Sequence, residues 1–416
     1  TRAVDSVGVP APERGSAVSA RRETEGGASP RVGIVVRSLG MGGLEEVVAL
    51  LARSLPNSGV GVSVHWLEQG GPVADRLRAS GVPVAVGDGS GRACAAWARD
   101  EGIDLISGHH LPVGVTGELT SLGLPVVETL HNTFAWYGPT EWEEELERVE
   151  LAAELVAVSD TVSAYYERHT RHRPRHVIPN AVHPGRVTAV PRAFARRRLD
   201  ISGPGPVFVA VGRLARQKNL PGLLGACTSV HRAEPEARVL VAGPPDPTVS
   251  LRVLRRGHPE SCASGAVRWL ETRRDVGTVL SAADAYVSAA FYEGWSVAAS
   301  EAAWVGLPLV LSEAGGAAEL AGRDPGPGPG DRGIVVVNPC GDPLDVDDVS
   351  IDADRDELHG THEVELADAM KAIADGLEGW RGRSEGIRSW ARRSLAPEVM
   401  SERYATLFQT VLERTS

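Results

Sequence analysis

Two cations follow an apolar run in the second half of a chain that has almost no lysine. The run Val207–Val211 ends at Gly212, and Arg213 and Lys218 come directly after it. Lys371 is the only other lysine among 43 basic residues. Cations are unfavourable at a helix start unless an anion compensates them. We therefore predict that Arg213 and Lys218 bind a diphosphate and stabilise it as a leaving group, with a solvated charge cluster as the alternative.

A second polar group follows the predicted strand Ala285–Ser288. It reads Glu293-Gly294-Trp295-Ser296-Val297, and Glu301 stands eight residues after Glu293. Amides at a helix start bind diphosphate or sugar hydroxyls, and Glu301, about two turns into the helix, can accept hydrogen bonds from ribose hydroxyls. Either glutamate alone would more often be a solvent-facing helix charge, but the preceding cationic loop favours a binding site.

The first half of the chain offers strand-end residues of its own. Gly42 and Gly43 follow the apolar run 32–36, and glycines let the backbone approach an anion at a helix start. A nicotinamide-binding loop is disfavoured, since Glu45 stands where the third glycine of Gly-x-Gly-x-x-Gly belongs. His131 follows the predicted strand 126–130 and can reach a sugar hydroxyl, and His110 follows another; either could equally be structural.

Paired aspartates raise the question of a metal. Asp345 and Asp347, and then Asp352 and Asp354, have the spacing that holds a divalent cation in other proteins. They belong to the acidic stretch 342–356, which we expect to be a solvated loop away from the strand-end loops. We therefore predict no metal and no cofactor.

The elements that must position these residues alternate between strands and helices. This alternation predicts an α/β protein with two Rossmann-like, doubly wound parallel sheets in tandem, facing one cleft. The expected strands are 32–36, 60–67, 82–86, 105–107, 126–130, 155–158, 176–178, 207–211, 237–242, 266–269, 285–288, 307–311 and 333–337.

Composition shifts divide the chain. Residues 1–30 are expected to be a disordered leader, 31–185 a first Rossmann-like domain and 205–385 a second one. A Pro-, Arg- and Gly-rich linker without periodicity covers 184–205. Residues 386–416 are helical in pattern and are expected to pack back on the first domain.

Charge and cysteine usage limit the partners. A net charge of −11 argues against a nucleic-acid partner and against stable membrane association, and the chain has no apolar run near the roughly 18 residues of a membrane span. Four separated cysteines without a Cys-x-x-Cys pair favour a reducing, cytoplasmic setting, and the abundance of Ala, Gly and Arg suggests a bacterial source. The oligomeric state stays open.

Taken in order, these motifs resemble glycosyltransferase family 4, a retaining family with the GT-B fold, over nearly all of the chain from Arg31. The matching segments are Gly42-Gly43, His131, Val156–Ser159, Ile178–Val182, Gly212-Arg213 with Lys218, Glu293 with Glu301, and Ala314-Gly315-Gly316 with Glu319. The family often differs at Asn132, His183, Ser296, Ala303 and Trp304, which leaves the donor preference open.

The resemblance implies that residues 31–185 form the acceptor domain and residues 205–385 the nucleotide-sugar donor domain, and it implies a role for each matched residue. Arg213 and Lys218 would bind the donor diphosphate with amides of Gly42 or Gly43 and of residues 295–297. Glu301 would hold the ribose. Glu293 would contact the transferred sugar, with Gly294 beside it, and His131 would lie at the reacting centre. The leaving phosphate would help to deprotonate the acceptor.

The same fold leaves rival functions open. A sugar-nucleotide epimerase or a C–N-coupling enzyme would keep the donor loops, a phosphorylase would need no nucleotide, and a silent subunit would bind nucleotide sugar without transfer. The acceptor is expected to be small and soluble. The acidic stretch 141–145 and the net charge of residues 31–185 (12 Arg − 19 Asp and Glu = −7) suggest an aminosugar or aminocyclitol, although a solvated helix face explains the stretch more simply.

Overall fold

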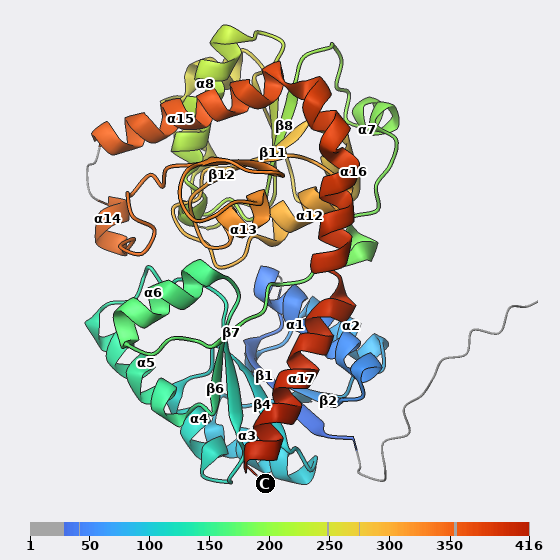
Figure 1. Ribbon diagram of the computed structural model, residues 1–416, viewed down its shortest axis with the longest axis vertical. Helices are drawn as coiled ribbons and strands as arrows, with labels where there is room; N and C mark the ends of the chain where they lie inside the picture. The colour runs from blue at the N-terminus through green and yellow to red at the C-terminus, as the bar shows by residue number, and fades with distance from the viewer. Residues whose placement is uncertain (1–28, 41, 248, 274, 353–355, 416) are drawn as a thin grey trace, which may run out of the picture.

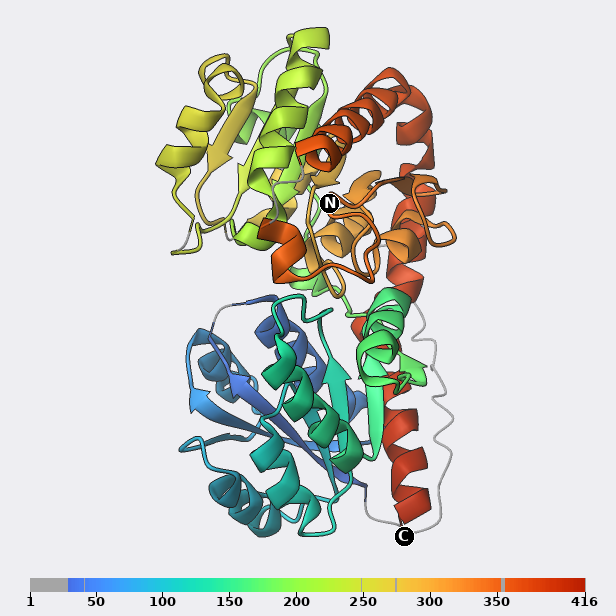
Figure 2. The ribbon, with the colours of Figure 1, turned by 90° about the vertical axis from the view of Figure 1, so that its left-hand side faces the viewer.

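Two α/β domains lie one above the other along the long axis of the molecule (Figures 1 and 2). The computed structural model describes residues 29–40, 42–247, 249–273, 275–352 and 356–415. The expected leader falls almost entirely outside the described residues. The first strand begins at Arg31.

The N-terminal domain contains a seven-stranded parallel sheet in the order β3-β2-β1-β4-β5-β6-β7. One of its interior strands, β1, is built from the apolar run 32–36, and the side chains of this run are buried, as expected for a strand that is covered on both faces. The strands are β1 (Arg31–Ser38), β2 (Gly61–Gln69), β3 (Val84–Val86), β4 (Leu105–His109), β5 (Val126–Leu130), β6 (Glu154–Ala157) and β7 (His176–Val177). The helices are α1 (Gly43–Ser54), η1 (Leu55–Ser58), α2 (Pro72–Ala79), α3 (Gly91–Asp100), α4 (Val113–Thr120), α5 (Pro139–Leu151) and α6 (Asp160–Thr170).

The C-terminal domain repeats the plan with the strand order β10-β9-β8-β11-β12-β14-β13, in which only the short edge strand β13 is antiparallel. The strands are β8 (Val207–Val211), β9 (Arg238–Ala242), β10 (Val267–Leu270), β11 (Ala285–Ser288), β12 (Leu309–Ser312), β13 (Gly328–Pro329) and β14 (Gly333–Val336). The helices are η3 (Arg216–Lys218), α8 (Leu220–Ala233), α9 (Leu251–Gly257), α10 (Pro259–Ala263), α11 (Val276–Ala282), α12 (Val297–Val305), α13 (Ala317–Ala321), α14 (Asp348–Asp352) and α15 (Asp356–Asp375).

The predicted architecture of two parallel sheets is confirmed. Every expected strand is present with ends shifted by two residues at most, and β5, β8 and β11 have the predicted bounds. The additional strand, β13, spans two residues, which is too short for a periodic signal.

The linker between the domains is more ordered than its composition indicates. It contains η2 (Pro184–Arg186) and α7 (Arg192–Arg198). Arg192 and Arg196 donate to Asp284 over 2.6 and 2.8 Å, and Arg381 reaches the same carboxylate over 2.9 Å. A single buried carboxylate therefore anchors the linker helix to the C-terminal domain. Its arginines gave no apolar period from which a helix could be predicted.

Two long helices close the chain. α16 (Leu377–Ser394) packs on the C-terminal domain, where Arg388 donates to the carbonyl of Val305 over 3.2 Å. α17 (Pro397–Thr415) then lies along the N-terminal domain (Figure 1), and Tyr404 Oη is 3.1 Å from Thr129 Oγ1. The boundary expected at residue 386 thus falls inside α16, and the part that returns to the first domain begins at Pro397.

Within the part of the chain that the structure describes, none of the helices combines the length and apolar character needed to cross a bilayer.

The Asp284 anchor can be tested by removing its carboxylate. The Asp284 side chain is 2% exposed and that of Arg196 is 11% exposed, so Asp284→Ala leaves a buried guanidinium without its partner. We expect a loss of about 3–5 kcal/mol in the free energy of unfolding, measured by urea denaturation. Asp75→Ala removes a 79% exposed carboxylate that pairs with Arg78, and should cost about 1 kcal/mol at most. Equal losses in the two variants would contradict the anchoring role.

Candidate functional site

The two domains meet through loops at the carboxyl ends of their strands. Gly294 follows β11, and a Cβ atom placed on it would lie 1.8 Å from the carbonyl oxygen of His131, which follows β5. Only glycine permits so close a backbone approach. The structure thus brings Gly294 and His131, both predicted site residues, into contact across the domain junction.

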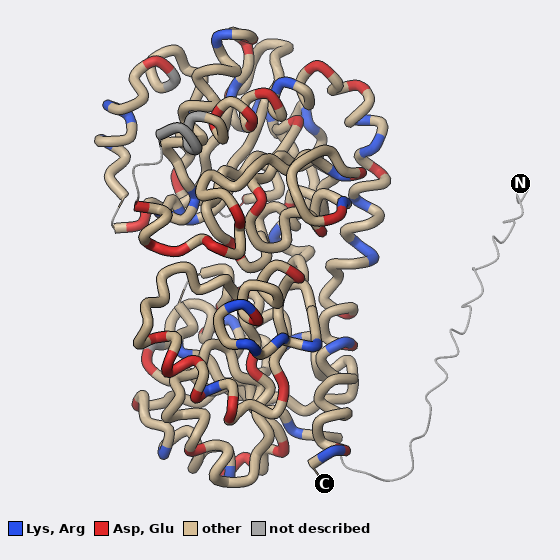
Figure 3. The backbone as a smooth tube through the Cα atoms, turned by 60° about the vertical axis from the view of Figure 1, so that its left-hand side comes forward, with Lys and Arg blue, Asp and Glu red and all other residues tan. Residues whose placement is uncertain are grey.

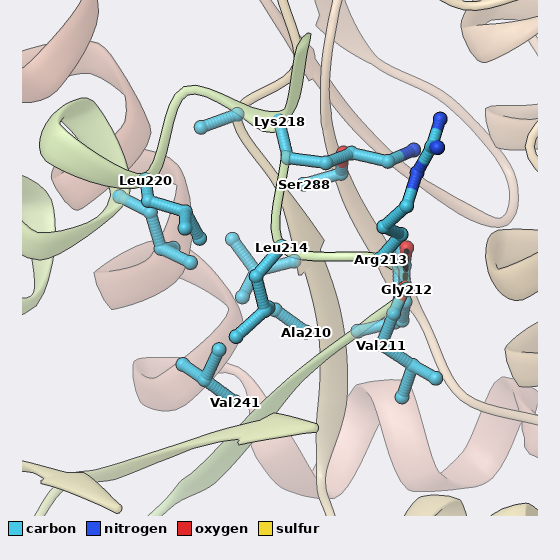
Figure 4. A pocket seen from close by; sticks show the side chains of 13 residues that line it. Ala210, Val211, Gly212, Arg213, Leu214, Lys218, Leu220, Val241 and Ser288 are labelled. Carbon is cyan, nitrogen blue, oxygen red and sulfur yellow. Dashed lines mark hydrogen bonds between the residues drawn. The ribbon is translucent and has the colours of Figure 1, made fainter. Parts of the chain in front are cut away.

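The loop after β8 holds the two predicted cations. Arg213 and Lys218 extend from this loop with their side-chain nitrogen atoms close together, beside a small pocket whose lining includes Gly212 and Ser288 (Figure 4). The Arg213 side chain is 67% exposed and its Nη1 is 3.5 Å from Asp246. Lys218 is half-buried and its ammonium contacts the carboxylate of Glu293. Arg213, Lys218 and Glu293 therefore form one group.

Burial shapes the charge of this group. Desolvation, followed by repulsion from Arg213, lowers the pKa of Lys218 to about 8, while the contact with Glu293 favours its charged form. An arriving anion would relieve the repulsion between the two cations and replace the carboxylate. The arrangement suits reversible binding of a diphosphate.

Hydrogen bonds tie the loop after β8 to the loop after β11. Gln217 Nε2 donates to the carbonyl of Tyr292 over 2.8 Å, and the amide of Phe291 donates to the carbonyl of Gln217 over 2.9 Å. The position of Lys218 is thereby fixed relative to Glu293.

The start of α12 is shaped by residues 294–297. The Trp295 side chain is 5% exposed, lies against Gly316, and donates from Nε1 to Ser300 Oγ over 2.8 Å. Ser296 caps the helix by accepting from the amide of Ala299 over 3.3 Å. The side chain of Trp295 is thus part of the core, and only its backbone can serve a ligand, together with Ser296 and Val297.

Glu301 lies further along α12 and is 3% exposed. Its Oε1 is 3.4 Å from Arg186 Nε, and Arg186 Nη1 is 3.3 Å from Glu46 of α1. Burial raises the pKa of Glu301 to about 7, and Arg186 opposes that shift. Arg186, which the sequence analysis did not single out, thus joins the predicted ribose-binding residue to the helix that begins at Gly43.

The Gly42-Gly43 turn is exposed at the start of α1. Gly42 has an extended φ of −172°, which any residue can adopt, and a Cβ atom on Gly43 would meet nothing within 4 Å. Neither glycine is required by the fold itself, which agrees with a turn left open for a ligand. The adjoining Met41 lies outside the described residues.

A buried glutamate fixes the turn that carries His110. Glu128 is fully buried, and its Oε1 accepts from the amides of His110 and Leu111 over 2.6 and 3.2 Å and pairs with Arg148. His110 has a left-handed φ of 61°, a strained conformation for a residue with a side chain. Desolvation raises the pKa of Glu128 to about 7 against the effect of Arg148. In the sequence, the signal for the structural role of Glu128 was the position of a charged residue within the apolar predicted strand 126–130.

The aspartates of the acidic stretch are about half exposed or more, as expected for a solvated loop. Residues 342–352 nevertheless contact both domains, so the expectation that the stretch lies away from the strand-end loops is wrong. Arg168 of α6 pairs with Asp345, and Tyr165 Oη donates to the carbonyl of Val346 over 2.9 Å. On the other side, Arg216 lies 3.0 Å from Asp348. An apolar cluster packs the stretch against the loops that follow β5 and β11, and its members are Ala135, Phe291, Cys340, Val346 and Ile351.

The described aspartates of the two predicted pairs have partners within the protein, and Asp347 accepts from the amide of Ser350 over 2.6 Å. Asp345 pairs with Arg168 and Asp352 with Arg216, while Asp354 lies outside the described residues. Across the described ranges, no group of three His, Cys, Asp or Glu side chains is placed to hold a metal ion.

The acidic helix α5 exposes Glu141, Glu143 and Glu144, as expected for a solvated helix face, but it buries Glu145. Glu145 is 3% exposed and pairs with Arg148, itself 3% exposed, and Tyr166 Oη donates to Glu145. Glu141 accepts from the amide of Gly138 over 3.0 Å and so caps the helix. Two of the four glutamates in this stretch therefore have internal partners.

Comparison with known proteins adds evidence that is independent of this geometry. Residues 41–186 match the family model Glycosyltransferase Family 4, and residues 205–345 match the model Glycosyl transferases group 1. The chain is 27% identical over 239 residues to a D-inositol 3-phosphate glycosyltransferase of Segniliparus rotundus, covering 53% of this chain and 52% of the relative. It is 28% identical over 247 residues to an alpha-maltose-1-phosphate synthase of Mycolicibacterium smegmatis, covering 53% and 62%.

These matches span about half to three fifths of the curated relatives. Among solved structures, HepE of Anabaena in complex with UDP is similar with a TM-score of 0.73 and 17% identity, over 92% of this chain and 100% of that one. This likeness concerns the fold.

The cation pair predicts a pH-dependent affinity for inorganic pyrophosphate. The pKa of Lys218 is lowered to about 8, so its ammonium loses the proton as the pH rises through that value, and the anion loses a partner. We expect affinity to fall about tenfold between about pH 7 and about pH 9, measured by calorimetry. Lys218→Arg should abolish this fall in affinity, because a guanidinium stays charged.

Lys371→Arg is the matched control, because it replaces the other lysine, on α15. It should retain the wild-type pH dependence. An identical pH profile in the wild type and in Lys218→Arg would exclude Lys218 from the anion site, because titration of pyrophosphate affects both proteins equally.

Proposed function

Because the chain belongs to glycosyltransferase family 4 and has the GT-B fold, we propose that it transfers a sugar from a nucleoside diphosphate sugar to a small acceptor, with retention of anomeric configuration. The observation that carries the proposal is the gathering of Arg213, Lys218 and Glu293 at the junction where Gly294 contacts His131.

The donor diphosphate binds Arg213 and Lys218. Amides at the start of α12 and in the Gly42-Gly43 turn add donors from both domains, where the helix ends favour an anion. Glu301 accepts hydrogen bonds from the ribose hydroxyls and exchanges its contact with Arg186 for them. Glu293, which lies against Lys218 in the free protein, holds hydroxyls of the transferred sugar. His131 and His110 complete the sugar and acceptor side.

Transfer breaks the bond between the anomeric carbon and the diphosphate oxygen, and the nucleoside diphosphate departs with the bonding electrons. The acceptor oxygen bonds to the same carbon from the face that the leaving group vacates, and its proton passes to a leaving phosphate oxygen. Arg213 and Lys218 stabilise the charge that develops on that phosphate. This cationic pair supplies the stabilisation without a metal ion.

Retention is supported by the state of the nearby carboxylates. Glu128 contacts Arg148, Glu293 contacts Lys218, and Glu301 contacts Arg186. Each of these carboxylates thus has a cationic partner, which makes it a weaker candidate for the general base that an inverting reaction would need on the acceptor side. The leaving phosphate is then the base.

A small polyhydroxylated ring, such as a cyclitol or an aminosugar, is the acceptor that we propose. The acidic stretch packs against the loops that follow β5 and β11 and so restricts the junction on that side. One relative is named for an inositol phosphate acceptor. Basic and acidic residues are interspersed along both domains (Figure 3), so a polyanionic acceptor is not favoured. The four cysteines are widely separated in sequence and include no Cys-x-x-Cys pair, which supports the proposed cytoplasmic location.

The donor can be identified by thermal unfolding with UDP-, GDP-, TDP- and ADP-sugars. The matching donor should raise the midpoint by several degrees, since a ligand that binds only the folded state stabilises it by mass action. That donor should then yield a product with retained configuration when myo-inositol or an aminocyclitol is added, read by NMR coupling constants. An inverted product would refute retention, and stabilisation by none of the four would refute the proposal itself.

Glu301→Gln tests whether Glu301 binds the ribose of the donor and not its diphosphate. Removing the carboxylate should weaken binding of the matching nucleoside diphosphate about 10- to 100-fold, the range for a hydrogen bond to a charged group. Binding of pyrophosphate, which has no ribose, should be unchanged.

Lys218→Ala is the complementary variant and should weaken both ligands. If Glu301→Gln weakened pyrophosphate as strongly as the nucleotide, Glu301 would not be the ribose ligand.

A further inference from the structure

A line of hydrogen bonds leads from the interior of the N-terminal sheet to His131. His109 ends β4, and its Nδ1 is 2.8 Å from His131 Nε2. Its other ring nitrogen, Nε2, is 3.2 Å from Ser107 Oγ. Ser107 is 0% and His109 1% exposed, so water does not compete for these atoms. The proposed function uses only the last residue of this line.

Burial favours the neutral form of both imidazoles. Burial lowers the pKa of His109 to about 3 and that of His131 well below its ordinary value. A neutral imidazole has one N–H and one acceptor nitrogen. The proton between the two rings is therefore carried by either His109 or His131. The hydrogen bonds that link Ser107, His109 and His131 can accordingly all be donated toward His131 or all be donated toward Ser107.

Ser107 decides the direction. If its hydroxyl donates to His109 Nε2, then His109 carries its proton on Nδ1 and donates to His131 Nε2. In the opposite direction His109 donates to Ser107, and the buried hydroxyl proton needs another acceptor. Within the described part of the chain, the hydroxyl of Ser107 forms its hydrogen bond with His109, and no other acceptor is placed for its proton. A buried donor without an acceptor is unfavourable, so the first direction is favoured.

In the favoured direction, the ring of His131 presents an N–H donor to the candidate functional site. With Nε2 of His131 accepting from His109, its proton is on Nδ1. That atom is buried and has no partner among the described residues, as is also true of His110 Nδ1 and Thr133 Oγ1. Buried polar atoms are normally satisfied. His131 and Thr133 belong to the loop after β5, whose backbone lies against Gly294 at His131, and His110 belongs to the neighbouring loop after β4. A polar ligand bound at these loops would satisfy the unpaired atoms.

We propose that Ser107 and His109 are positioning residues that hold His131 in its Nδ1–H form, so that His131 donates a hydrogen bond to a substrate oxygen and is not a general base. The proposal rests on the proposed function for the identity of the substrate. The tautomer itself is a property of the free protein.

The tautomer is measured by NMR of protein labelled with ¹⁵N in histidine, with His131→Asn used to assign the resonances. In the wild type the protonated nitrogen of His131 should be Nδ1. His109→Leu removes the donor and should give a mixture of both tautomers. His109→Asn places an amide near the former Nδ1 and should restore the Nδ1–H form. A wild-type His131 protonated on Nε2 would overturn the proposal.

Activity provides the second readout, using the donor found by thermal unfolding. His109→Leu should lower kcat about tenfold or more, the effect of one misplaced hydrogen bond, and His109→Asn should recover most of that loss. His65→Leu is the matched control. His65 is a 2% exposed histidine of the same sheet, stacked on Trp97, and its replacement should leave kcat unchanged.

The outcomes separate the two proposals. An Nδ1–H tautomer together with no transfer from any nucleotide sugar would refute the function and keep the positioning role. Transfer that falls equally in His109→Leu, His109→Asn and His65→Leu would refute the positioning role and keep the function.

Discussion

The approach of Gly294 to the carbonyl of His131 is the constraint on which the site depends. A side chain at residue 294 would force the two domains apart. Parallel sheets present their loops at the carboxyl edge, and here two such edges are held face to face. The loop after β11 is braced from behind, since the amide of Gly316 donates to the carbonyl of Gly294 over 2.9 Å. Small residues at this junction thus determine how the polar side chains meet.

Charges at the junction are paired before any ligand arrives. Lys218 contacts Glu293, and Arg186 lies between Glu46 and Glu301. Burying a lone charge is costly, so the partner in each pair opposes the desolvation of its members. In the donor complex proposed above, the diphosphate takes the place of Glu293 beside Lys218, and ribose hydroxyls take the place of Arg186 beside Glu301. Since Arg186 belongs to the interdomain linker, the exchange at Glu301 also affects a contact between the domains.

The region around the junction is closed by segments distant in the chain. The acidic stretch joins α6 to η3 through Arg168 and Arg216, and Glu319 of α13 accepts from the amide of Asp160 at the start of α6 over 2.9 Å. α16 and α17 cross from one domain to the other. The domains are therefore connected on several sides, which supports the small acceptor proposed above.

The sequence by itself determined the two parallel sheets and the strand-end positions of Arg213, Lys218, Glu293 and His131. Apolar runs broken by glycine are local signals, and a parallel sheet brings strand ends to one edge without further information. The partners of these residues were decided only by the tertiary structure. Asp284 with its three arginines, Arg186 at Glu301 and His109 at His131 join elements whose separation in space no local pattern encodes. The acidic stretch was misjudged for the same reason: its composition suits solvent, but arginines and a tyrosine from both domains supply its partners.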